Sequence, residues 1–187
     1  MRLPRTHVLF IALASLACAQ ADDDAITSPA FSVGGGVAAI VNGGGHYEIP
    51  GLIVQFSTSG IVHADGRVSG NFHHSTTADG ELVEFHGMVT CLPVDPVNHR
   101  AWVGGVITEN LSTHPDFQGG IFDPGHDIWF RLVDYGQGAD SPPDRTTFVG
   151  FEGSAEIETS EEYCALQIWP DEDARTWPVT GNIKVKS

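Results

Sequence analysis

The sequence predicts an all-β protein, a single antiparallel β-barrel of about eight strands, with a β-sandwich as the alternative. Short apolar runs alternate with polar residues at period two, which is typical of half-buried strands. The 22 glycines and 11 prolines supply the frequent turns that such strands need. No long run in the body has a convincing helical period. A barrel is preferred over an open sheet because closure removes exposed strand edges.

Turn signals and alternation define the strands. Asp65-Gly66 and Asp79-Gly80 are Asp-Gly pairs, the strongest short-range signal for a hairpin. The predicted strands are 43–48, 52–63, 67–74, 81–92, 100–108, 127–134, 163–169 and 179–186, and 147–157 is a further candidate.

The first residues predict export. Arg2 and Arg5 precede an apolar stretch, 8–17, that is too short for a bilayer span of about 20 residues and suits a signal peptide. We predict a signal peptide over 1–18, cleaved at or shortly after Cys18, a flexible tether over 19–42 and the barrel domain over 43–187.

Two interpretations of the cleavage site remain open. Small-x-small sites at 17–19 and 19–21 indicate free secretion into the periplasm or the extracellular space. Alternatively, Ser15-Leu16-Ala17-Cys18 resembles a lipobox, in which Cys18 would carry a lipid anchor. The polar tether favours the second interpretation, because an anchored domain needs such a segment.

Three cysteines are present, and exported thiols tend to pair. We expect a Cys91–Cys164 disulfide, with Cys18 either removed or lipidated.

The acidic balance excludes some partners. The chain has 24 Asp and Glu against 9 Lys and Arg, a net charge of −15. Such a surface repels nucleic-acid phosphates and anionic lipid headgroups. We therefore expect no nucleic-acid partner, and membrane contact only through an N-terminal lipid. Solubility is the simplest role of the charge, and cation binding is the more specific one.

Several motifs resemble those of a family of uncharacterised bacterial exported proteins and lipoproteins. They are His63-Ala-Asp-Gly66, His86-Gly-x-Val-x-Cys91, Trp102-Val-Gly-Gly-Val-Ile107, Val133-Asp-x-Gly-x-Gly138 with Pro142-Pro143-Asp144, and Gly181-Asn-Ile-x-Val185. The resemblance extends from about Gly44 to the end of the chain. It implies one exported β domain and no particular chemistry.

Histidines and tryptophans are the candidate small-ligand residues, namely His63, His73, His86, Trp102 and Trp129. His73 and His86 fall on the polar side of a predicted hairpin and could gather with Glu84 on one face. Zinc needs three or four converging ligands, but no HExxH or CxxC spacing is present. The simpler interpretation of the histidines is that they are polar side chains facing solvent. The simpler interpretation of the tryptophans is ordinary packing in the core.

The loop 134–144 (DYGQGADSPPD) is the candidate metal site. Asp134, Asp140 and Asp144 offer carboxylates on a segment that glycines allow to wrap, as calcium requires. The spacing is not that of an EF-hand, and a turn in which Asp side chains bind backbone N–H groups is the alternative. No other cofactor is predicted.

No GxSxG elbow or phosphate-binding glycine loop is present. We predict a non-enzymatic exported β domain, a cell-envelope lipoprotein with a small-ligand-binding or accessory role. The alternative is an enzyme of isomerase or cyclase type that uses His and acidic residues in the barrel lumen. The two differ in whether the interior is packed or hollow and in which face the histidines occupy.

Overall fold

The computed structural model describes residues 36–138, 140–169 and 175–187. The described residues belong to one compact unit. The predicted signal peptide and the first part of the predicted tether lie outside the described residues. The first strand begins at Val37, so residues 37–42 belong to the barrel and not to the tether. No helix in the described part of the chain is long and apolar enough to cross a membrane.

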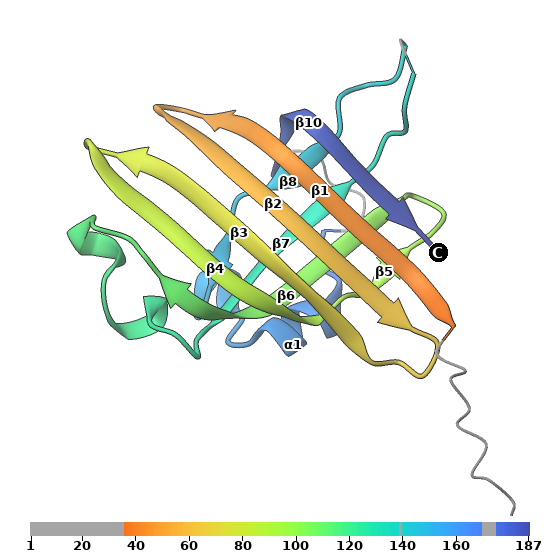
Figure 1. Ribbon diagram of the computed structural model, residues 1–187, viewed down its shortest axis with the longest axis horizontal. Coiled ribbons are helices and arrows are strands. Elements are labelled where there is room, and N and C mark those ends of the chain that lie inside the picture. The colour runs from red at the N-terminus through yellow and green to blue at the C-terminus, as the bar shows by residue number, and fades with distance from the viewer. Residues whose placement is uncertain (1–35, 139, 170–174) are drawn as a thin grey trace, which may run out of the picture. The chain divides into compact units, whose positions relative to one another are not determined.

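This unit is an antiparallel barrel (Figure 1). Its strands within the described residues are β1 Val37–Ile49, β2 Leu52–His63, β3 Val68–Ala78, β4 Glu81–Cys91, β5 Val94–Asp95, β6 Arg100–Asn110, β7 Asp127–Val133, β8 Arg145–Thr147, β9 Gly150–Phe151 and β10 Thr176–Lys186. They form one sheet in the order β5-β6-β4-β3-β2-β1-β10-β8-β7-β9, and pairing of β6 with β7 closes eight of them into a ring. The all-β barrel prediction is confirmed.

Strand alternation fills the barrel with apolar side chains. Phe56, Phe72, Phe85, Phe130 and Ile183 come from five different strands and are all 3% exposed or less. They belong to one continuous core. Each fully buried side chain of this size contributes about 1.5–3 kcal/mol, so the interior is the main source of stability.

One close strand crossing requires glycine. Gly45 in β1 and Gly181 in β10 are Cα partners. A Cβ added at Gly181 would lie 2.1 Å from the Gly44 carbonyl oxygen, far inside van der Waals contact. The missing side chains let these strands approach and coil where the sheet curves toward closure.

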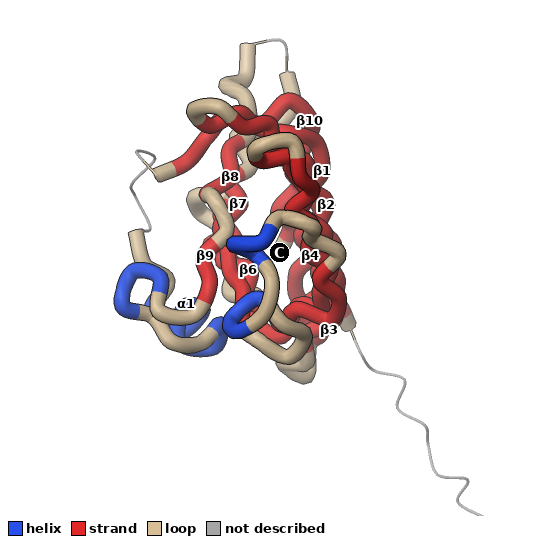
Figure 2. The backbone as a smooth tube through the Cα atoms, turned by 90° about the vertical axis from the view of Figure 1, so that its left-hand side faces the viewer, coloured by secondary structure: helices blue, strands red, loops and turns tan. Residues whose placement is uncertain are grey.

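A second layer covers the outside of β6 and β7. The helix α1 (Ser160–Leu166) lies outside this wall (Figure 2). Its Tyr163 packs with Trp102, Trp129 and Ile157 in a separate apolar cluster. The predicted Cys91–Cys164 disulfide is confirmed, with the two Cα atoms 6.2 Å apart, and it joins α1 to β4.

The prediction of a strand at 163–169 is wrong. Thr159 caps the helix there, because its side chain accepts the Glu162 backbone N–H, and the Glu162 carboxylate accepts the Glu158 backbone N–H. These reciprocal contacts resemble a capping box, which stabilises a helix start. The candidate strand 147–157 is not continuous. It contains the last residue of β8, the two residues of β9 and a 3₁₀ turn, Ser154–Glu156.

Two carboxylates complete the closure between β10 and β7. The intervening strand β8 has only three residues and pairs with Thr176–Pro178 at the start of β10. Further along β10, the backbone N–H of Ile183 donates to Asp144 (2.7 Å) and that of Val185 donates to Asp134 (2.9 Å). Side-chain oxygens thus satisfy donors that the short strand does not reach.

The disulfide gives the first test. In the chain-entropy description, a bond closing 73 residues of chain stabilises the folded state by roughly 4 kcal/mol. The double variant Cys91→Ala/Cys164→Ala should therefore unfold at a clearly lower denaturant concentration, with tryptophan fluorescence as the measurement. The reduced wild-type chain should match it. A variant as stable as the oxidised protein would contradict the role given to the bond.

Candidate functional site

An apolar cavity of about 100 Å³ lies at one end of the barrel interior. The start of β2, the end of β3 and the start of β4 form one side of it, and the residues around β9 form the other. Its lining consists of Leu52, Val54, His74, Ser75, Thr76, Ala78, Val83, Phe85, Phe117, Phe148, Val149 and Phe151. Phe148 is 39% exposed, so the cavity reaches the surface at this end.

His74 is the one ionisable residue in that lining. It projects inward from β3 and is 3% exposed. Its ring centroid lies 4.6 Å from that of Phe130, 5.9 Å from Phe56 and 6.2 Å from Phe72. Neither ring nitrogen has a hydrogen-bond partner among the described residues.

Burial determines the protonation state of His74. Loss of water disfavours the charged ring and, with a smaller contribution from the neighbouring His73, lowers its pKa to about 3. The imidazole is therefore neutral near pH 7. A neutral imidazole offers one N–H donor and one nitrogen acceptor.

Unpaired polar atoms of this kind are rare in protein interiors. A buried group without a partner costs about 1–3 kcal/mol. The hydroxyls of Tyr47 and Thr58 are also buried without a partner in the described structure, but neither residue lines the cavity. Among the described residues that line this cavity, His74 is the one with a buried polar group that lacks a partner, so the cavity can accept a molecule that is apolar with one polar group.

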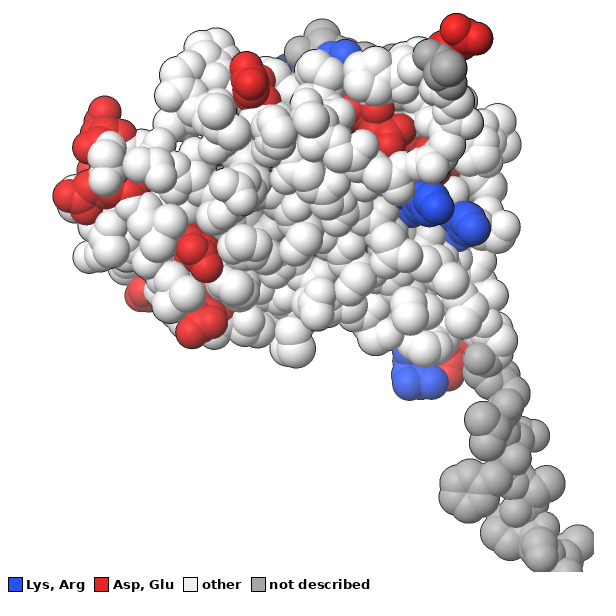
Figure 3. Space-filling model, turned by 45° about the horizontal axis from the view of Figure 1, so that its top comes forward, with Lys and Arg blue, Asp and Glu red and all other residues white. Residues whose placement is uncertain are grey.

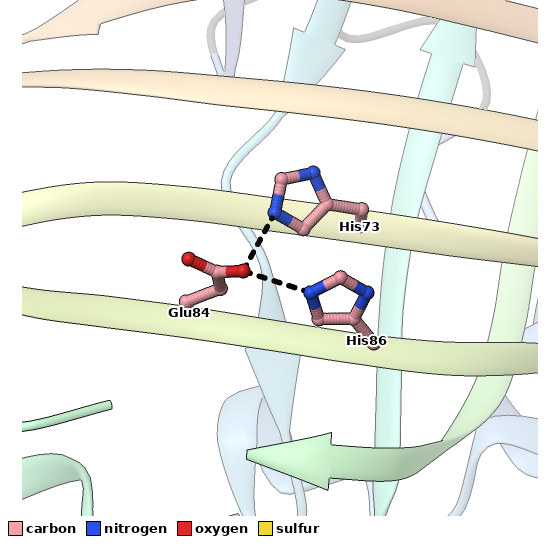
Figure 4. Close-up of side chains that lie close together, drawn as sticks. All are labelled: His73, Glu84 and His86. Carbon is pink, nitrogen blue, oxygen red and sulfur yellow. Dashed lines mark hydrogen bonds and ion pairs between the residues drawn. The ribbon is translucent and has the colours of Figure 1, made fainter. Parts of the chain in front are cut away.

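The five predicted ligand residues occupy three separate places. His73 and His86 lie together on the outer face of β3 and β4, beside Glu84 (Figure 4). His63 lies at the end of β2, where its Nε2 is 3.0 Å from the Ser69 hydroxyl.

Trp102 and Trp129 lie under α1 on the outside of the barrel. None of the five predicted ligand residues lines the interior cavity. The structure therefore does not bring these five residues together in one site. The reason is strand parity, which turns each of them away from the lumen.

The predicted calcium loop is organised as a turn within its described part. Asp134 accepts the backbone N–H groups of Gly136 and Val185, and Asp144 accepts those of Tyr135 and Ile183. All four oxygens of these two carboxylates are used in this way, while Asp140 is exposed. The geometry favours the hydrogen-bonded turn over a calcium site.

Sequence reasoning missed His74 as a site residue. The signal was present, because Val68, Gly70 and Phe72 alternate along one face and position 74 continues the same parity. A histidine on an otherwise apolar strand face is therefore the feature that identifies the cavity.

Comparisons with protein-family models, with curated proteins and with solved structures find no match for this chain.

The buried histidine predicts a specific pH dependence of stability. In the unfolded chain His74 takes up a proton near pH 6.5, but in the folded protein it does so only near pH 3. Between these values the unfolded state holds more protons, so the free energy of unfolding falls as the pH drops. From this residue alone the loss at pH 5 is about 2 kcal/mol.

We expect His74→Phe to reduce the difference in unfolding free energy between pH 7 and pH 5. Urea unfolding followed by tryptophan fluorescence measures it at both values. His74→Leu, a smaller apolar replacement, should behave in the same way. An unchanged difference in both variants would show that His74 is not held neutral by burial.

Proposed function

We propose that the protein binds a small, mostly apolar molecule at the end of the barrel lumen, with His74 as its hydrogen-bonding partner. The observation that carries this proposal is a neutral, fully buried imidazole without a protein partner in the wall of an apolar cavity. Apolar cavities of about 150 Å³ bind single aromatic rings. The cavity of about 100 Å³ is smaller but opens to the surface beside Phe148, so it suits a ligand no larger than a single ring.

A binding role is better supported than lumen catalysis. An isomerase or cyclase that uses His and acidic residues needs a carboxylate near the histidine, and the described lining contains no Asp or Glu. A general base is most effective when its pKa lies near the working pH. His74, with a pKa of about 3, is a weak base but an adequate hydrogen-bonding group.

We also propose that the domain is exported and held at the membrane by a lipid on Cys18. The Cys91–Cys164 disulfide supports the first part, because such bonds persist in oxidising compartments. The lipobox-like residues 15–18 support the second.

Replacing Cys18 with Ala should move the protein from the membrane fraction to the soluble fraction, because the thiol that would carry the lipid is absent. Immunoblotting of separated fractions measures this. An unmodified mature wild-type chain that starts at Gln20 or Asp22 by mass spectrometry would exclude the anchor and leave free secretion.

Phenol and toluene test the lumen site, since the two rings have similar size and only phenol carries a hydroxyl. Both should bind, with affinities measured by calorimetry. His74→Phe should lower the phenol-to-toluene affinity ratio by about 3- to 10-fold, the value of one net hydrogen bond.

A matched pair of variants tests whether the cavity itself holds the ligand. Ala78 lines the cavity, and Thr77 is exposed on the opposite face of the same strand. Ala78→Phe should abolish binding of both rings by filling the space, whereas Thr77→Phe should leave it intact. Absence of binding to the wild-type protein, or binding that survives Ala78→Phe, would contradict the proposal.

A further inference from the structure

A second, unrelated group of side chains lies on the outside of the barrel. His73 in β3 and His86 in β4 are Cα partners across the hairpin, and Glu84 precedes His86 by two residues on the same face. Their ring and carboxylate atoms converge in Figure 4. One potential ligand atom from each of the three lies within 4.8 Å of the other two.

The distances between these atoms suit a tetrahedral metal ion. Glu84 Oε1 lies 2.8 Å from His86 Nε2 and 3.4 Å from His73 Nε2. Two ligands of tetrahedral zinc, each about 2.0–2.1 Å from the metal, are about 3.3 Å apart. The imidazole centroids are 4.5 Å apart, so small side-chain rotations suffice to bring all three atoms around one ion.

His73 supplies a second, independent observation. Its Nε2 atom is shielded from solvent, yet it makes no hydrogen bond within the described structure. The 3.4 Å approach to Glu84 is close enough for an electrostatic contact but lacks hydrogen-bond geometry. A metal bound to this lone pair would satisfy an atom that the protein itself leaves unsatisfied.

The backbone beneath Glu84 is fixed on both sides. Its N–H donates to the Ser112 hydroxyl at 3.0 Å, and its carbonyl accepts the Leu111 N–H at 3.0 Å. His86 is held in register opposite His73 on β3, and its carbonyl accepts the Thr108 hydroxyl. Ligands placed on hydrogen-bonded strands are better ordered than ligands on a loop.

The local charge favours a cation. Neither β3 nor β4 contains Lys or Arg, and the chain as a whole carries a net charge of −15. Acidic groups are scattered over the face shown in Figure 3 and do not form one patch. The overall field therefore attracts cations in general, and the choice of ion is left to the ligand set.

We propose that His73, Glu84 and His86 form a zinc-binding site on the outer surface of the barrel. Two imidazole nitrogens and one carboxylate oxygen are ligands of zinc, whereas calcium and magnesium prefer oxygen alone. The three side chains are one fifth to two fifths exposed, so water can supply a fourth ligand. This site is separate from the lumen and does not depend on the ligand proposed there.

The test is calorimetric titration of the full chain with zinc chloride, after treatment with a chelator and its removal. Zinc should bind with a stoichiometry of one at this site, and calcium or magnesium should not compete. Glu84→Gln and His86→Ala should each weaken binding by at least about tenfold. Far-UV circular dichroism checks that both variants are folded.

His63→Ala is the matched control, because His63 also lies on a strand of the same barrel but outside the cluster. It should bind zinc as the wild type does. A direct readout comes from long-range ¹H–¹⁵N spectra, in which zinc should shift the Nε2 resonances of His73 and His86.

Three results would overturn the proposal. The first is the absence of zinc binding, and the second is binding of copper(II) alone. The third is a zinc affinity in the cluster variants equal to that of the wild type, which would place the ion at others of the nine histidines.

Discussion

Closure of the barrel between β10 and β7 is the constraint on which the rest of the structure depends. Three-residue β8 cannot pair with the full length of β10, and Asp144 and Asp134 supply acceptors for the backbone N–H groups of Ile183 and Val185. Asp144 is only 7% exposed, and hydrogen bonds to a charged acceptor are stronger than neutral ones. Without this closure β10 would be an open edge and water would reach the lumen. The burial that keeps His74 neutral therefore depends on the barrel being closed.

Strand alternation assigns two adjacent histidines to different chemistry. His74 points into the lumen, where loss of water keeps it neutral, and His73 points outward beside Glu84. The two rings are separated by the sheet alone. The same alternation along β4 places Phe85 inside the barrel and His86 outside it. Both proposed sites lie on the β3–β4 hairpin, so they share a structural support although they share no side chain.

Patterns of period two predicted most of the fold, because alternation is a local property of a strand. The bounds expected for 52–63 match β2, and the disulfide followed from export and cysteine count. Helix α1 was missed because its seven residues are too few for a helical period to emerge, although Thr159 and Glu162 carry the capping signal. The roles of Asp134 and Asp144 depend on contacts about 40 to 50 residues away, which no local pattern contains.

The two walls of the barrel differ in what lies outside them, and this difference locates the candidate sites. β6 and β7 are buried on both faces over most of their length, since α1 covers them and the disulfide fastens it. A Cβ at Gly104 would lie 2.8 Å from the Ser160 carbonyl oxygen and 3.0 Å from Cys164 Sγ, both in α1, so the covering helix is packed directly against the strand. β2 and β4 instead alternate between buried and accessible residues. An outer metal site can form only on this uncovered wall, where the histidines remain accessible. A lumen site requires the covered wall to stay fixed while the open end of the barrel, beside Phe148, admits a ligand.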